Sequence, residues 1–230
     1  MRHPDGFQKL VLAAFLATSV LLIITATIWG ARLLITHRAQ ATPPPAANVM
    51  PGVPIGGHPA PDFSLTNQFG QPVSLASLRG HEVVLAFIDS RCTSICPLTA
   101  KIMYDARARL KSSASQVELV AINANPAATS IPDVQNWSIK HGMLHQWLFL
   151  TGTAPQLKAI YHAYGVYDGV TSDGQAIHDP VMYIIDAQGR EQLYFETLNS
   201  NITADISSQE AGLEIGMRQW LPTATTVGTR

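Results

Sequence analysis

The two cysteines of the chain, Cys92 and Cys96, lie four positions apart in the stretch SRCTSICP. Cysteines at this spacing on a helical turn can form a disulfide without any long-range folding. Such a disulfide closes a very short loop, so it restricts the unfolded chain little and adds little stability. The pair is therefore predicted to do chemistry, either as a redox dithiol or as two soft thiolate ligands for a metal.

The residues around the cysteines predict that the pair lies where a strand runs into a helix. Residues 82–89, EVVLAFID, form a short β-branched apolar run that is typical of a buried strand. From Leu98 to Leu110 an apolar residue recurs at every fourth position, as on one face of a helix, and Pro97 suits its first position. The dipole of such a helix favours thiolate over thiol near its N-terminus.

A metal would need at least one more ligand, and among the eight histidines His178 stands out. It lies two residues before Pro180, where a thioredoxin-like fold has its cis-proline loop. That loop faces the start of the first long helix, so His178 is expected to reach Cys92 and Cys96. Two thiolates and one imidazole suit Cu(I), whereas structural zinc would take a fourth ligand. A Cu(II) form would add an oxygen ligand such as Asp179.

The elements that position these residues alternate along the chain. The predicted strands are 117–123, 147–150, 181–186 and 192–196, the predicted helices are 132–141, 154–164 and 207–221, and a β-hairpin is predicted around Phe69-Gly70. This order predicts an α/β sandwich with right-handed crossovers. Residues 58–222 are long enough for one domain with a single core, followed by a short tail at 223–230.

The N-terminal part of the chain predicts a membrane anchor. Residues 10–31 carry no charge and would form a helix about 30 Å long, enough to cross a bilayer. We therefore expect residues 1–40 to hold a transmembrane helix, with the N-terminus cytoplasmic and the domain extracytoplasmic. The proline- and glycine-rich residues 41–57 predict an extended tether. The alternative is a cleaved signal peptide, since residues 39–41 have a small-x-small pattern.

The charge balance argues against a nucleic-acid partner. Charged residues make up 13% of the chain and the formal net charge is -1, whereas nucleic-acid binding calls for a basic surface.

The cysteine and histidine motifs resemble the Sco/SenC family, membrane-tethered proteins that help metallate the copper site of cytochrome c oxidase. The likeness covers roughly residues 60–222 and is most specific in Cys92-x-x-x-Cys96-Pro97 and in HDPVMYIIDAQG, which begins at His178. It implies a thioredoxin-like fold, with a central mixed β-sheet flanked by helices and an N-terminal hairpin extension. It also implies that Cys92, Cys96 and His178 are copper ligands.

The resemblance further implies a partner, either the copper-site subunit of cytochrome c oxidase or another extracytoplasmic thiol protein. Ile177 stands where an aspartate often precedes the family's histidine. Metal-bound histidines usually have a hydrogen-bond partner on the second ring nitrogen, so Asp179 becomes the candidate for that role.

The same two sulfurs support two alternative functions. A thiol:disulfide oxidoreductase would use one of Cys92 and Cys96 to attack a partner disulfide and the other to resolve the mixed disulfide. A thiol peroxidase is suggested by the T-x-x-C pattern of residues 93–96, although Asp89 stands where that motif has proline. The sequence leaves open whether the protein delivers copper or maintains thiols, because both activities need both cysteines.

Overall fold

The computed structural model describes residues 22, 49, 52–170, 176–197 and 206–222. The chain divides into two compact units, residues 1–47 and 48–230, and of the first unit only Leu22 is described. Apart from Leu22, the predicted membrane helix therefore lies outside the described residues, as do most of the predicted tether and the C-terminal tail. No helix in the described part of the chain is long and apolar enough to cross a membrane.

The second unit is built on a mixed sheet of six strands in the order β1-β10-β9-β4-β5-β6. The strands are β1 Val53–Pro59, β4 Glu82–Ile88, β5 Val117–Asn123, β6 Leu148–Leu150, β9 Val181–Ile185 and β10 Arg190–Glu196. Strands β4, β5 and β6 are parallel, and β9, β10 and β1 continue the sheet antiparallel. The predicted α/β class with a central mixed sheet is confirmed.

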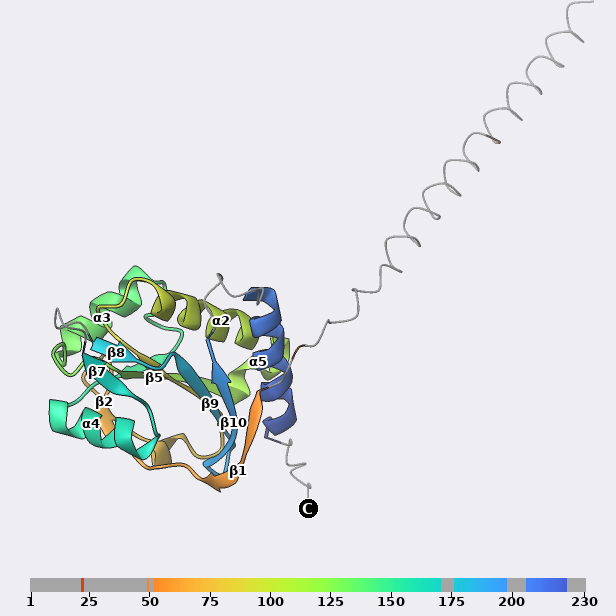
Figure 1. The fold of residues 1–230 in the computed structure, drawn as a ribbon. Helices are drawn as coiled ribbons and strands as arrows, with labels where there is room; N and C mark the ends of the chain where they lie inside the picture. The colour runs from red at the N-terminus through yellow and green to blue at the C-terminus, as the bar shows by residue number, and fades with distance from the viewer. Residues whose placement is uncertain (1–21, 23–48, 50–51, 171–175, 198–205, 223–230) are drawn as a thin grey trace, which may run out of the picture. The chain divides into compact units, whose positions relative to one another are not determined.

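Helices cover both faces of the sheet (Figure 1). The helices α2 Ile95–Arg109, α3 Ile131–Lys140 and α5 Ile206–Trp220 contribute to one core, and α4 Ala154–Ala163 contributes to the other. Every residue of β4 is buried, and its alternate side chains enter opposite cores, with Val84 in the first and Val83 in the second. This is why β4 reads as a continuous apolar run instead of an alternating one.

The second core is completed by the predicted hairpin, in which β2 Ser64–Thr66 pairs with β3 Pro72–Ser74 around Gly70. Two short 3-10 helices, Leu75–Leu78 and Lys111–Gln116, connect neighbouring elements. The helix predicted from Pro97 begins two residues earlier, at Ile95, so Cys96 lies inside the first turn of α2.

Two parts of the unit differ from the sequence prediction. Strand β1 begins inside the stretch predicted to be tether and pairs with β10 at the edge of the sheet, a place that tolerates Pro54. Its register shifts between Pro54 and His58, where Gly56 and Gly57 adopt positive φ. A second hairpin, β7 Asp168–Val170 with β8 Ala176–His178, was not predicted, and it carries His178.

Candidate metal centre

Cys92 lies in the loop between β4 and α2 and is held through its backbone. Its N–H donates to the carbonyl of Asp89 at 3.0 Å, and its carbonyl accepts a hydrogen bond from Nε1 of Trp137 at 3.2 Å. The side chain is half-buried, and its Sγ accepts the backbone N–H of Cys96 at 3.4 Å. The start of α2 thus presents an N–H group to this sulfur, as the sequence predicted.

Cys96 is almost completely buried and faces the histidine predicted to be its partner. Its Sγ lies 3.5 Å from Nε2 of His178, a residue 82 positions away in the sequence. Both cysteines are free thiols. The fold therefore brings the first turn of α2 together with the end of β8, which is the juxtaposition that a shared ligand would need.

The imidazole of His178 is oriented through its other nitrogen. Nδ1 lies 3.0 Å from the backbone carbonyl of Asp179, which can only accept, so Nδ1 is the donor of this hydrogen bond and Nε2 is the nitrogen that faces the sulfur. The carboxylate of Asp179 instead accepts the backbone N–H of Tyr167 at 3.0 Å, which ties the hairpin together. Asp179 was predicted to accept a hydrogen bond from the second ring nitrogen of His178. Its backbone carbonyl lies at that nitrogen, while its carboxylate holds the N–H of Tyr167.

The loop after His178 also differs from expectation. No peptide bond among the described residues is cis, so the bond before Pro180 is trans and the prediction of a cis-proline loop is wrong. Pro180 instead begins the turn from the β7–β8 hairpin into β9, and its carbonyl accepts the N–H of Thr197.

The two thiols have very different acidities. A hydrogen bond from the Cys96 thiol, opposed by partial burial and aided by the N–H groups of Cys96 and Ser94, lowers the pKa of Cys92 to about 5. The same hydrogen bond, then burial, then the negative charge of Cys92 raise the pKa of Cys96 far above its ordinary value. Near neutral pH the pair therefore holds one proton, and Cys92 is the thiolate.

A buried polar network supports the loop from behind. Asp89, which ends up buried after β4, accepts the N–H of Arg91 at 2.7 Å and the side-chain amide of Asn125 at 2.9 Å. Asn123, also buried, donates to the carbonyl of Ala128. Asp89 stands close to Cys92 in the sequence, but nothing in the sequence indicates that Asn125, in the loop after β5, would hold it.

The structure brings the three predicted ligands to one region without closing a three-ligand cluster. Cys92 contacts Cys96, and Cys96 contacts His178. Within the described residues, no three His, Cys, Asp or Glu side chains stand close enough together to hold a metal ion as they are. The arrangement offers a thiolate, a protonated thiol and an imidazole next to one another in space, which are soft or borderline donors.

The comparison with known proteins identifies the chain's relatives. A family model described as SCO1/SenC matches residues 56–209. A protein from Bacillus subtilis named SCO1 protein homolog is 25% identical over 132 residues, which cover 56% of this chain and 68% of the relative.

Solved structures agree with this relationship at the level of the fold. Arabidopsis thaliana ScoI with copper bound is 23% identical, with a TM-score of 0.60 over 70% of this chain and 99% of that one. Bradyrhizobium japonicum ScoI with copper bound is 20% identical, with a TM-score of 0.58 over 70% and 99%. These structures share the thioredoxin-like architecture described above. Because the family model also spans most of the folded unit, this chain belongs to the SCO1/SenC family.

Proposed function

We propose that this protein binds Cu(I) through Cys92, Cys96 and His178 and passes it to the copper-site subunit of cytochrome c oxidase. The observation that carries the proposal is the 3.5 Å approach of the Cys96 sulfur to Nε2 of His178, whose Nδ1 is already hydrogen-bonded. An imidazole beside two thiols is the donor set that a three-coordinate Cu(I) ion prefers. Two relatives of the same fold have been solved with copper bound.

In this proposal the ion is cargo, and the chain's own groups do the work of holding and releasing it. Cys92 is already a thiolate near neutral pH, while Cys96 must lose its proton when it becomes a ligand. Binding then draws Cys92 toward the Cys96–His178 pair. Release proceeds by ligand exchange, in which an incoming thiolate or imidazole replaces these ligands one at a time.

The protein would pass copper to its partner on the extracytoplasmic side of a membrane. The uncharged residues 10–31 would anchor the chain in a membrane, with the N-terminus cytoplasmic and the folded unit on the extracytoplasmic side. On that side the partner would be an assembling copper subunit or another thiol protein.

The direct test is Cu(I) affinity, measured by competition with a Cu(I) chelator in reducing buffer. We expect one tightly bound ion per chain, and a loss of affinity of roughly tenfold or more in His178→Ala, the range typical for weakening a metal centre. His162→Ala, which removes an exposed histidine on α4, is the control. Equal affinity in the parent and in His178→Ala would refute the three-ligand site.

A second candidate function is a thiol:disulfide oxidoreductase, favoured by the asymmetry of the two thiols. The half-exposed Cys92 thiolate would attack a partner disulfide, and Cys96 would then attack the mixed disulfide and release the partner as a dithiol. This protein would end as the Cys92–Cys96 disulfide and would need an external thiol reductant. Turnover of a disulfide substrate by the parent and by His178→Ala at equal rates, with weak copper binding in both, would favour this function.

The thiol peroxidase alternative stays a prediction from the T-x-x-C pattern. Consumption of hydrogen peroxide by the reduced protein tests it directly.

A further inference from the structure

A second histidine is linked to the Cys92 loop through one shared side chain, Trp137. His141 is the C-terminal cap of α3, and its ring packs on the indole of Trp137 with a centroid separation of 4.1 Å. The same indole donates its N–H to the carbonyl of Cys92. One rigid side chain, itself stacked on Trp147, therefore positions both the His141 ring and the Cys92 loop.

The imidazole of His141 has an unsatisfied nitrogen. Nε2 is shielded from solvent and has no hydrogen-bond partner among the described residues. A buried polar atom without a partner is costly, and native structures retain such atoms mainly where they serve binding or catalysis.

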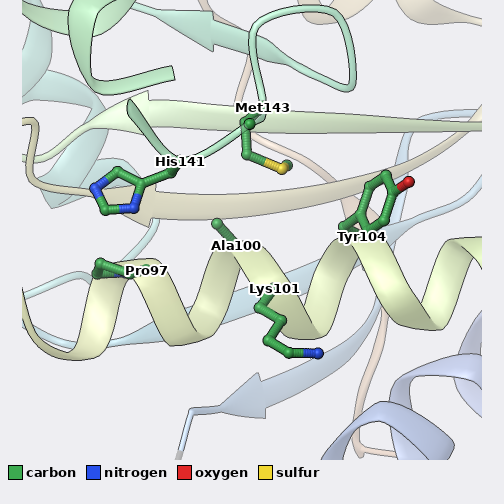
Figure 2. A pocket seen from close by; sticks show the side chains of 7 residues that line it. Pro97, Ala100, Lys101, Tyr104, His141 and Met143 are labelled. Carbon is green, nitrogen blue, oxygen red and sulfur yellow. The ribbon is translucent and has the colours of Figure 1, made fainter. Parts of the chain in front are cut away.

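A pocket of about 370 Å³ opens beside His141, over the first turns of α2. Figure 2 shows the His141 ring above Pro97, turned toward the start of the helix, with Met143 above Ala100. Pro97, which lines the pocket, directly follows Cys96 in the chain. Pro97, Ala100 and the thioether of Met143 form an apolar part of the lining, and Lys101, Tyr104 and His141 add polar groups, so the pocket leaves room for a donor group carried by another molecule.

We propose that His141 is an exchange ligand, an imidazole that holds Cu(I) together with Cys92 while the ion enters or leaves the site. Cys92 is the more exposed sulfur. Trp137 links its loop to His141, and Cys96 links it to His178. On entry, the bond from copper to His141 breaks as bonds to Cys96 and His178 form, and Cys96 releases its proton to solvent. Copper stays Cu(I), so no electron donor is required.

This inference rests on the proposed copper function and adds a route to it. The test uses the full chain and Cu(I) supplied as a complex with a small chelator. In His141→Phe, which keeps the ring stacked on Trp137, we expect an equilibrium affinity close to the parent's and a transfer rate about tenfold lower, equal to about 1.4 kcal/mol in barrier. His145→Phe is the matched control, because His145 is an exposed ring in the same loop, stacked on Phe69.

The outcomes distinguish a failure of the exchange-ligand role from a failure of the proposed copper function. A parent that binds no Cu(I) refutes both. Tight binding in the parent with an unchanged transfer rate in His141→Phe refutes only the exchange ligand. An affinity loss in His141→Phe as large as that in His178→Ala would make His141 a resident ligand and also overturn the proposal.

A second measurement does not depend on kinetics. In the Cys96→Ser/His178→Ala variant the resident site is dismantled, and X-ray absorption should find Cu(I) bound by one sulfur and by nitrogen. Adding His141→Phe to that variant should remove the nitrogen contribution. Retention of the nitrogen signal in the triple variant would show that another group supplies it and would refute the role of His141.

Discussion

At the scale of single residues, Cys92 and Cys96 carry the same group in different protonation states. The Cys92 thiolate receives hydrogen bonds from Cys96, and its pKa falls to about 5. We predict that alkylation of the reduced protein by iodoacetamide rises through a midpoint near pH 5, at Cys92 alone. Cys92→Ser should leave the buried Cys96 unreactive in the folded state at neutral pH. A midpoint near 8.5, the ordinary thiol value, would contradict this assignment.

Asp89 places a buried negative charge behind the dithiol. The hydrogen bond to Cys92, burial and the Cys92 charge raise the pKa of Cys96 most. A hydrogen bond with the Asp89 backbone lowers that pKa, and the Asp89 carboxylate raises it by a smaller amount. Near neutral pH the reduced pair carries one negative charge, whereas the disulfide is neutral, so the Asp89 charge disfavours the reduced form relative to the disulfide.

We therefore predict that Asp89→Asn raises the reduction potential of the pair by up to about 30 mV, which corresponds to about 1.4 kcal/mol. The asparagine Oδ1 can still accept from Arg91 and Asn125, so the network survives. Thiol–disulfide equilibration with glutathione measures this potential. Asp105→Asn, a change on α2 outside this network, is the control, and a lowered potential in Asp89→Asn would contradict the electrostatic argument.

At the scale of elements, the β7–β8 hairpin is the arm that carries His178. Its strands pair with each other and form a sheet of their own. The carboxylate of Asp179 bonds the N–H of Tyr167 across the base of this arm.

Asp179→Ala should loosen the hairpin and lower Cu(I) affinity by about tenfold, the lower end of the range for removing a support behind a metal ligand. Asp179→Asn keeps an acceptor oxygen and should bind nearly as well as the parent. The melting temperature should change little in either variant, since this hairpin lies outside the six-stranded sheet. If Asp179→Ala binds Cu(I) as tightly as Asp179→Asn, the hydrogen bond between Tyr167 and Asp179 does not position His178.

The elements differ in how far the sequence could predict them. Strands β4 and β5 were predictable because both faces of each are buried, which demands an unbroken apolar run. The β7–β8 hairpin was not, because residues 168–178 are rich in glycine and polar residues and show no alternation. β1 was hidden by its prolines and glycines, which an edge strand tolerates.

The residues of the site also differ in how far the sequence could place them, depending on whether their position follows from sequence neighbours or from contacts with distant parts of the chain. The position of Cys96 at the start of a helix followed from its neighbours in the chain. The approach of His178 was predicted only through the likeness to a thioredoxin-like fold, and it survives although the expected cis bond is absent. His141 gave no signal, because a single histidine at the end of a predicted helix is typical of a surface residue, and only packing on Trp137 links it to the Cys92 loop.

At the scale of the whole folded unit, the two ends of β4 have opposite effects on ionisable side chains: one end favours the charged form and the other favours the neutral form. The C-terminal end leads to Asp89 and the Cys92 thiolate, where hydrogen bonds stabilise charge. The N-terminal end holds Glu82, which is completely buried and has no hydrogen-bond partner for either carboxyl oxygen among the described residues. Burial, helped by the charge of Asp186, raises the pKa of Glu82 to about 9. The folded protein therefore keeps this carboxyl protonated at neutral pH.

The sign of the resulting pH dependence follows from proton counting. Between about pH 4.5 and pH 9 the folded state binds a proton at Glu82 that the unfolded state has released, so this group makes the free energy of unfolding fall as pH rises. The slope is at most about 1.4 kcal/mol per pH unit. Cys92 acts in the opposite direction above about pH 5, because its folded-state pKa is lowered.

Comparison with a variant isolates the contribution of Glu82. Glu82→Gln keeps the volume and removes the titration, so urea unfolding from pH 5 to pH 9 should give a free energy of unfolding that rises with pH relative to the parent's. The gap between the two proteins should move in favour of the variant as pH rises. Glu196→Gln, a change of an exposed glutamate on β10, should follow the parent curve. Parallel curves for the parent and Glu82→Gln would mean that Glu82 titrates at its ordinary pKa in the folded protein, and that the buried end of β4 admits water.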